Sequence, residues 1–333
     1  LKTDQEQAQL MKRRAGVGFD ISNIRPRGVL TANAAKSTDG IGLFMERFSN
    51  TCREVAQGGR RGALMQTISI HHPEIDTFIN IKRDRKKVTG ANISIRLTDE
   101  FMEAVKADKE YQQRWPVENK KNPALSQMVS AKKVWDSIID SAHDCAEPGL
   151  LFWDTCLRYT PSDAYTSKGM GSISCNPCSE ILLSANDSCR LMVVNAFSFV
   201  KEPFTKNAKL NFEKLIETSE AAQRLMDDLV DLELECIQKI IDKIVADPEP
   251  KEIKAIELNL WKKIYASCES GRRTGLGVTG IADTLAALGI RYGSTESIEA
   301  TKEIYKCLAL GAYRSSVQMA EERGAFPLYE YKL

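Results

Sequence analysis

The sequence lacks any excess of charge of one sign. Its 46 lysines and arginines almost balance 45 aspartates and glutamates, which leaves a formal net charge of +1. Proteins that bind nucleic acids or membrane surfaces electrostatically carry a basic excess or a basic stripe. The balanced composition therefore gives no electrostatic case for a nucleic-acid or membrane partner, and we expect neither.

Long apolar runs and targeting patterns are also missing. No apolar run reaches the roughly 18 residues that a membrane helix needs, and the polar start of the chain has no signal-peptide pattern. Histidine is scarce, and neither His71 and His72 nor His143 lies near a cysteine pair at zinc-finger spacing. We therefore expect no bound metal.

Cysteine, by contrast, is frequent. The nine cysteines are odd in number and scattered along 333 residues. That pattern is typical of reduced thiols in a cytoplasmic protein and not of a secreted disulfide framework. A hydrophobic content of 43% and a charged content of 27% are those of an ordinary globular protein, with one large core or two modest domains.

Strand-like and helix-like segments alternate along the chain, which predicts an α/β fold. The strand candidates are residues 16–20, 63–70, 91–97, 150–153, 191–200 and 275–280. The helix candidates are residues 5–14, 40–56, 74–81, 98–105, 131–146, 211–246, 281–288 and 297–323. Glycine-containing loops are expected at 23–39 and 57–62.

The most informative segment is the sequence SCNPCSE at residues 174–180. It places an amide, a thiol and a carboxylate at alternate positions, namely Asn176, Cys178 and Glu180. In an extended segment, alternation directs these three side chains to the same side. We therefore expect three short polar groups to converge, as a reaction on a small polyhydroxylated substrate would require.

Other interpretations of Cys175-x-x-Cys178 remain open on the residues alone. The pair has the spacing of half a zinc site or of a thioredoxin-like dithiol. Neither is favoured, because no second metal-binding pair follows and because the segment after Pro177 does not look like the start of a helix. Each cysteine is also compatible with a buried structural role.

A resemblance to a known family distinguishes between these interpretations. NPCSEI at 176–181, followed by SCRL at 188–191, resembles the finger loop and adjoining strand of the ribonucleotide reductase catalytic subunit. Further matching motifs occur in the family's order, from about Arg13 to Phe326. They are RAGVGFD at 14–20, IRPRG at 24–28, QGGRRGA at 57–63, HPEI at 72–75, GRRTGLGVTG at 271–280 and EERGAFP at 321–327.

The resemblance implies a fold for the chain. The family closes ten strands into an α/β barrel built from two antiparallel halves, with the finger loop threaded through its centre. We expect residues 1–333 to form an incomplete barrel of this type. Residues 1–70 would include the effector-binding loops and helices, and residues 170–185 the finger loop. Both ends of the chain are expected to be cuts within a longer sequence.

The resemblance also implies roles for residues. Cys178 would carry a thiyl radical that abstracts hydrogen from the ribose. Glu180 would accept the proton of the 3′-hydroxyl, and Asn176 would hydrogen-bond the substrate hydroxyls. Cys189 would be one of two thiols that supply the reducing electrons and close to a disulfide.

The sequence departs from the family pattern at the second redox thiol. In the family this thiol lies on a strand before the motif that begins here at Arg14. Cys52, Cys145 and Cys156 do not occupy the matching position. The family's phosphate-binding loop and C-terminal shuttle cysteines would lie beyond Leu333. A non-catalytic split-gene fragment is therefore an alternative to a catalytic chain.

Two loops are expected to bind a deoxynucleoside triphosphate effector, by resemblance. The loop 23–37 would close over the effector, and the loop 57–62 would transmit its identity to the substrate base. Guanidinium groups suit a triphosphate, and glycines allow a loop to switch between arrangements. The candidate effector residues are Arg25, Arg27, Gln57, Gly58, Gly59 and Arg61.

The resemblance further implies a radical source and partners. The runs DSCRL at 187–191 and RTGLGVTG at 273–280 are most similar to the adenosylcobalamin-dependent enzymes. The alternative is the type that needs a separate metal-bearing radical subunit. A ribonucleotide substrate, a thioredoxin-like or glutaredoxin-like reductant and a homodimer are expected. The glycine spacing Gly275-x-Gly277-x-x-Gly280 matches a dinucleotide-binding motif, but no suitably placed acidic residue accompanies it.

Overall fold

The computed structural model describes residues 1–32, 36–55, 60 and 62–329. These residues form two compact units, 1–185 and 186–333, which are described separately below. No helix among the described residues is both long and apolar enough to cross a membrane.

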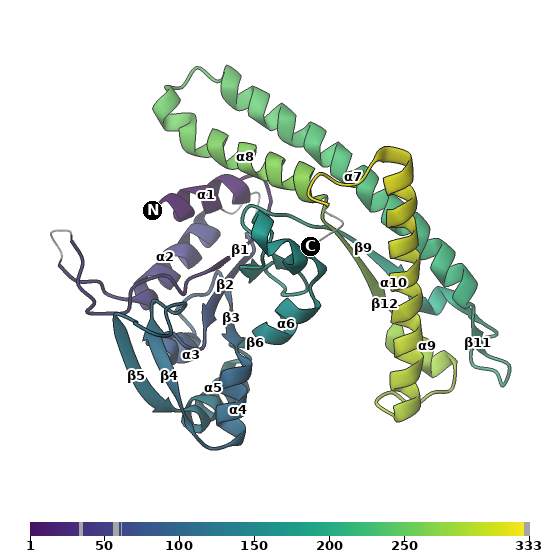
Figure 1. The fold of residues 1–333 in the computed structure, drawn as a ribbon, viewed down its shortest axis with the longest axis horizontal. Helices are drawn as coiled ribbons and strands as arrows, with labels where there is room; N and C mark the ends of the chain where they lie inside the picture. The colour runs from purple at the N-terminus through teal and green to yellow at the C-terminus, as the bar shows by residue number, and fades with distance from the viewer. Residues whose placement is uncertain (33–35, 56–59, 61, 330–333) are drawn as a thin grey trace. The chain divides into compact units, whose positions relative to one another are not determined.

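The first unit is built on a parallel sheet with the strand order β1-β2-β3-β6 (Figure 1). The strands are β1 (Val17–Asp20), β2 (Leu64–Ser69), β3 (Asn92–Leu97) and β6 (Gly149–Phe152). β2 is buried along its whole length and β3 from its second residue onward. A parallel sheet covered on both faces accounts for these nearly continuous buried runs.

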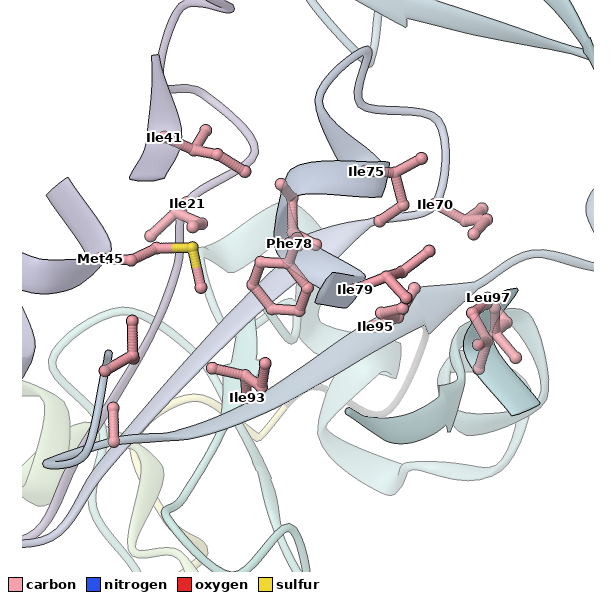
Figure 2. Close-up of a cluster of buried hydrophobic side chains, with 14 of the residues drawn as sticks. Ile21, Ile41, Met45, Ile70, Ile75, Phe78, Ile79, Ile93, Ile95 and Leu97 are labelled. Atoms are coloured by element: carbon pink, nitrogen blue, oxygen red, sulfur yellow. The ribbon is translucent and has the colours of Figure 1, made fainter. Parts of the chain in front are cut away.

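Helices cover one face of this sheet. They include α2 (Ile41–Glu54), α3 (Ile75–Asn80) and α5 (Ala131–Cys145). Figure 2 shows Phe78 and Ile79 of α3 beside Ile93 and Ile95 of β3, and all four side chains are fully buried or nearly so. Each such side chain contributes about 1.5–3 kcal/mol through burial, so this layer is the main core of the unit.

The remaining elements of the first unit connect or flank the sheet. The helices are α1 (Lys2–Met11), α4 (Asp99–Lys106) and α6 (Trp153–Tyr159), with 3₁₀ turns at Ile81–Arg83 and Pro161–Lys168. Thr98 caps α4 by accepting the backbone N–H of Phe101. β4 (Glu110–Trp115) and β5 (Leu125–Ser130) form an antiparallel hairpin, and β7 (Ser174–Cys175) and β8 (Leu182–Leu183) form a second, shorter one.

The second unit packs long helices on a pair of parallel strands. β9 (Arg190–Asn195) pairs with β12 (Thr274–Thr279), while α7 (Phe212–Ala246) packs against α10 (Thr295–Arg323). A Cβ on Gly311 of α10 would come within 2.6 Å of the Ile216 carbonyl oxygen, so the two helices can approach only because a glycine is present. The other elements are α8 (Lys251–Gly271), α9 (Ile281–Ala287), the 3₁₀ turn Ala196–Phe199, β10 (Val200–Lys201) and β11 (Lys209–Leu210).

The predicted α/β class is confirmed. All six predicted strands are present as the parallel strands β1, β2, β3, β6, β9 and β12. Within the described ranges they lie in two separate sheets that do not close into a barrel, in agreement with an incomplete barrel. The predicted strand 191–200 is too long. It ends at Asn195, whose side chain accepts the N–H of Phe197 and starts the 3₁₀ turn.

Candidate active site

Residues 176–181 form a tight turn between β7 and β8. The backbone N–H of Asn176 donates to the Ile181 carbonyl oxygen at 3.1 Å, and the Ser179 N–H donates to the Asn176 carbonyl oxygen at 3.1 Å. The Ile181 N–H also donates to the side-chain Oδ1 of Asn176 at 3.1 Å. Asn176 therefore closes the turn with both its backbone and its side chain.

The expectation of an extended segment was wrong at this point. The extended backbone of β7 ends at Cys175. Pro177 and Cys178 lie in the turn, and Ser179 has a φ of 71°. The physical reason is the side-chain amide of Asn176. Its oxygen accepts a backbone N–H and thereby stabilises a turn instead of a longer pairing of β7 with β8. Simple alternation does not place Asn176, Cys178 and Glu180 on one side, although the turn keeps all three within one short hairpin.

The two cysteines of the hairpin differ in environment. Cys178 is exposed at the turn, whereas Cys175 is buried at its base with its sulfur 3.6 Å from Ser179 Oγ. Burial raises the pKa of the Cys175 thiol, so this group stays protonated at neutral pH. Cys175 therefore has a structural role, while the Cys178 thiol is accessible to a reaction partner.

The hairpin is fastened to the sheet next to Cys178. Asn92, the first residue of β3, donates its Nδ2 to the Pro177 carbonyl oxygen at 2.8 Å. At the base, Cys175 and Leu182 pack with Met65, Leu151 and Trp153 in a small buried cluster. These contacts lie on the side of β2 that carries Met65 and Thr67, opposite the helix-covered side. The turn that carries Cys178 thus has rigid support.

Cys189 lies in the second unit, directly before β9. Its sulfur is half-buried and donates to the Arg190 carbonyl oxygen at 3.7 Å. The buried guanidinium of Arg190 holds the start of β9. It forms an ion pair with Glu233 of α7 at 2.6 Å and donates to Cys268 Sγ of α8 at 2.7 Å. Asn176, Cys178 and Glu180 thus share one hairpin, and Cys189 belongs to a separate element.

Comparison with known proteins identifies the family. The model of the ribonucleotide reductase barrel domain matches residues 1–332. The chain belongs to the ribonucleotide reductase family.

Three relatives show the range of similarity within the family. The vitamin B12-dependent ribonucleoside-diphosphate reductase of Thermoplasma acidophilum is 32% identical over 97% of this chain and 38% of its own length. The enzyme of the same name from Mycobacterium tuberculosis is 29% identical, over 97% of this chain and 42% of its own length. The ribonucleoside-diphosphate reductase large subunit of variola virus is 26% identical, over 97% and 41%. The chain therefore spans about two fifths of the length of these relatives.

The predicted effector residues are only partly within the described part of this chain. Arg25 and Arg27 are exposed on the loop between β1 and α2, and the Arg25 guanidinium lies 5.9 Å from the centre of the Trp115 ring. Glu74 supports this loop by accepting the Ile41 N–H at 3.0 Å, and burial raises the pKa of its carboxyl group. The predicted residues Gln57, Gly58, Gly59 and Arg61 lie outside the described residues.

Two further predictions concern metal and dinucleotide sites. Among the residues that the structure describes, no group of three or more His, Cys, Asp or Glu side chains is arranged to hold a metal ion. Gly275 and Gly277 lie inside β12, and only Gly280 occupies the turn before α9. A dinucleotide-binding motif places its glycines in the strand-to-helix turn, so β12 and α9 do not have that arrangement.

Residues that hold the hairpin or the start of β9 in place, without a role in the proposed chemistry, were not predicted from the sequence. Asn92 holds Pro177, Arg190 anchors the start of β9, and Asp20 pairs with Arg96 beneath the hairpin. The detectable sign was a charged residue within a predicted strand, namely Asp20 in 16–20 and Arg96 in 91–97. Such charges are almost never buried unless they are paired.

Proposed function

We propose that this chain is the catalytic part of a ribonucleoside-diphosphate reductase, which reduces ribonucleotides to 2′-deoxyribonucleotides through a thiyl radical on Cys178. The observation that carries the proposal is the exposed Cys178 on a fastened hairpin between Asn176 and Glu180, in a chain of this family. The region 170–185 is then the finger loop, and the substrate is a ribonucleotide that binds beside it.

Each residue of the hairpin has a task that suits its chemistry. The Cys178 sulfur, once oxidised to a thiyl radical, abstracts a hydrogen atom from the ribose. Glu180 accepts the proton of the 3′-hydroxyl. Asn176 Oδ1 already accepts the Ile181 N–H, so the Asn176 side chain contributes mainly its Nδ2 donors to the substrate hydroxyls.

Reduction at the 2′-carbon requires two electrons in addition to the radical. Cys189 supplies one of two thiols, which are oxidised to a disulfide as the 2′-hydroxyl leaves as water. None of the cysteines in this sequence occupies the position that the second thiol has in the family pattern. A thioredoxin-like or glutaredoxin-like dithiol would reduce the disulfide after each turnover.

Adenosylcobalamin is the proposed source of the radical. The vitamin B12-dependent relatives support it, and the exposed sulfur of Cys178 is accessible to a cofactor bound beside the loop. When bound, the cofactor supplies the species that oxidises the thiol. No corrin-binding residues are assigned in the described part of the chain. The proposal also includes a homodimer, a cytoplasmic location and a deoxynucleoside triphosphate effector, which would bind at Arg25, Arg27 and the 57–62 loop.

The proposal is tested with the intact protein, ribonucleoside diphosphates, an effector and a dithiol, and deoxyribonucleotide is measured. We expect product only when adenosylcobalamin is added, without any second protein. Product that depends on a metal-bearing partner subunit and not on the cofactor would assign the chain to the other reductase type. No product under either condition, with the protein folded, would contradict the reductase function itself.

Cys189→Ser should separate the radical step from the reductive step. Because the hydroxyl cannot form a disulfide, we expect the variant to retain radical formation at Cys178 but to lose sustained turnover. Electron paramagnetic resonance would follow the radical, and product counts per site would follow reduction. Cys236→Ser is the matched control, because Cys236 is a free, exposed cysteine on α7. Repeated turnover of Cys189→Ser at the wild-type rate would make Cys189 structural only.

A further inference from the structure

Two charged residues are buried beneath the finger loop. Asp20 ends β1 and Arg96 lies near the end of β3, with side-chain exposures of only 7% and 11%. Arg96 Nε lies 3.1 Å from Asp20 Oδ2. Charges removed from water are costly unless they are paired and hydrogen-bonded, so the surroundings of this ion pair indicate what it supports.

From Asp20, a chain of hydrogen bonds leads to the first strand of the loop. Asp20 Oδ2 accepts the hydroxyl of Thr67 at 3.0 Å, and Thr67 Oγ1 lies 3.0 Å from Ser174 Oγ. A carboxylate paired with a guanidinium has no proton to give, so Thr67 must direct its single proton to Asp20. Ser174 therefore donates to Thr67, and the direction of the whole chain is fixed.

From Arg96, a second connection reaches the preceding residue of the loop. Its Nη1 donates to the Ile173 carbonyl oxygen at 3.1 Å and its Nη2 to Ser22 Oγ at 3.3 Å. The guanidinium carbon also lies 4.7 Å from the centre of the Trp153 ring, within the range of a cation–π contact. One ion pair therefore holds two successive residues of the loop, Ile173 by its carbonyl and Ser174 by its hydroxyl.

The ion pair connects the loop to three strands of the sheet. Asp20 and Ser22 come from β1 and the turn that follows it, Thr67 from β2 and Arg96 from β3. Ser22 is only 2% exposed to solvent, and Thr67 is 0% exposed. Water has little access to these bonds, which strengthens them. A rigid parallel sheet thereby dictates where β7 begins.

We propose that Asp20 and Arg96 are positioning residues of the finger loop, which fix β7 at Ile173 and Ser174 and thereby the place of Cys178. The consequence for turnover rests on the proposed function of Cys178, but the consequence for loop order does not. A reacting group must be held to a fraction of an ångström, and a displacement of about 1 Å costs about a hundredfold in rate. We name this group of four side chains, Asp20, Arg96, Thr67 and Ser174, the loop clamp.

The first two test variants loosen the loop clamp and leave the buried ion pair intact. Ser174→Ala removes one hydrogen bond, and Thr67→Val removes two, those of Thr67 to Asp20 and to Ser174. Both variants keep the Asp20–Arg96 pair. Thr284→Val and Ser141→Ala are matched controls, because both residues are fully buried with a hydroxyl bonded to a backbone carbonyl and neither touches the loop. Arg96→Lys and Arg96→Gln form a second pair, in which the lysine retains a charge for Asp20.

The first measurement is amide hydrogen exchange of the intact protein, with the rate of Cys178 alkylation measured in parallel. We expect Ser174→Ala to speed exchange at Asn176, Ser179 and Ile181 by about tenfold, the effect of one lost hydrogen bond, and Thr67→Val to speed it by at least as much, because it loses two. Exchange in β2 and β3 should remain unchanged. An equal rise throughout the first unit would mean a general loss of stability and would overturn the proposal.

The second measurement is steady-state kinetics. We expect the clamp variants to lower kcat by about ten- to a hundredfold with little change in KM, since the loop is misplaced while substrate binding elsewhere remains. Arg96→Lys should recover part of the activity that Arg96→Gln loses. Unchanged loop exchange, or faster exchange with an unchanged kcat, would overturn the proposal. If Cys178→Ser were active while loop exchange followed the prediction, the proposed function would fail and the clamp would remain.

Discussion

Replacing Cys178 with serine should reduce ribonucleotide reduction to background. A serine hydroxyl has nearly the size of the thiol, so the turn closed by Asn176 and the contact of Asn92 with Pro177 should persist. The O–H bond does not yield a usable radical, so the first step is lost. The expected fall is about a thousandfold or more, as for other essential catalytic groups. Deoxyribonucleotide formation by the intact protein, with cofactor, effector and dithiol, measures it.

Controls separate loss of chemistry from loss of fold. Cys236→Ser removes an exposed cysteine on α7 and should leave turnover unchanged. Binding of a deoxynucleoside triphosphate and the thermal unfolding midpoint of Cys178→Ser should match the wild type. Substantial product from Cys178→Ser would remove the radical role from this residue, and the reductase mechanism proposed for the hairpin would have to be abandoned.

The strands that position the site could be predicted from the sequence. The segment 63–70 was predicted as a buried strand and 91–97 as a strand in which apolar and polar residues alternate, and both are strands of the sheet. The long amphipathic helix predicted at 211–246 was equally clear, and it corresponds to α7. Hydrophobic periodicity records which face of an element is buried, and it succeeds where burial alone decides the structure.

The shape of the loop could not be predicted in this way. Alternation applies only while the backbone is extended, and the turn at Pro177 depends on side-chain hydrogen bonds to the backbone, chiefly from Asn176 to Ile181. Asp20 and Arg96 were missed because the partner of a buried charge lies far away in sequence. Their separation of 76 positions (from 20 to 96) is bridged only by the sheet pairing of β1, β2 and β3.

The family resemblance supplied what local patterns could not. The roles of Asn176, Cys178, Glu180 and Cys189 remain proposals, but the motifs that suggested the reductase family led to a correct assignment. The helix α8 (Lys251–Gly271) and the β4–β5 hairpin were not predicted. Most of the strand Leu125–Ser130 is exposed, so it has no distinct apolar pattern. The buried residues Leu260, Trp261, Ile264 and Cys268 of α8 do have helical spacing, and this signal was overlooked.

Replacing Gly18 with alanine should displace the β7–β8 hairpin, the proposed finger loop. Gly18 lies in β1 opposite Met65 of β2. A Cβ at this position would overlap the carbonyl oxygen of Cys175 and lie 2.9 Å from its carbonyl carbon. The obstacle is backbone and cannot rotate away as a side chain could. Because β1 is held in register by the sheet, the loop strand β7 must move.

The expected effects of Gly18→Ala are on stability and on activity. Overpacking of this kind costs about 1–3 kcal/mol, measurable as a lower free energy of unfolding in denaturant. A shift of β7 by about 1 Å also moves Cys178 and should lower kcat by about a hundredfold. A crystal structure or hydrogen exchange of residues 173–183 would locate the displacement at the loop.

Gly277→Ala in β12 is the matched control for this substitution. Gly277 is also a glycine in a parallel strand, but the nearest atom to its Cβ would be the Met192 carbonyl oxygen at 3.9 Å, an ordinary contact. It should therefore have nearly wild-type stability and activity. If Gly18→Ala were equally harmless, the close approach of Cys175 to β1 would not determine the position of the loop. Only Asn92 and the loop clamp would then hold Cys178 in place.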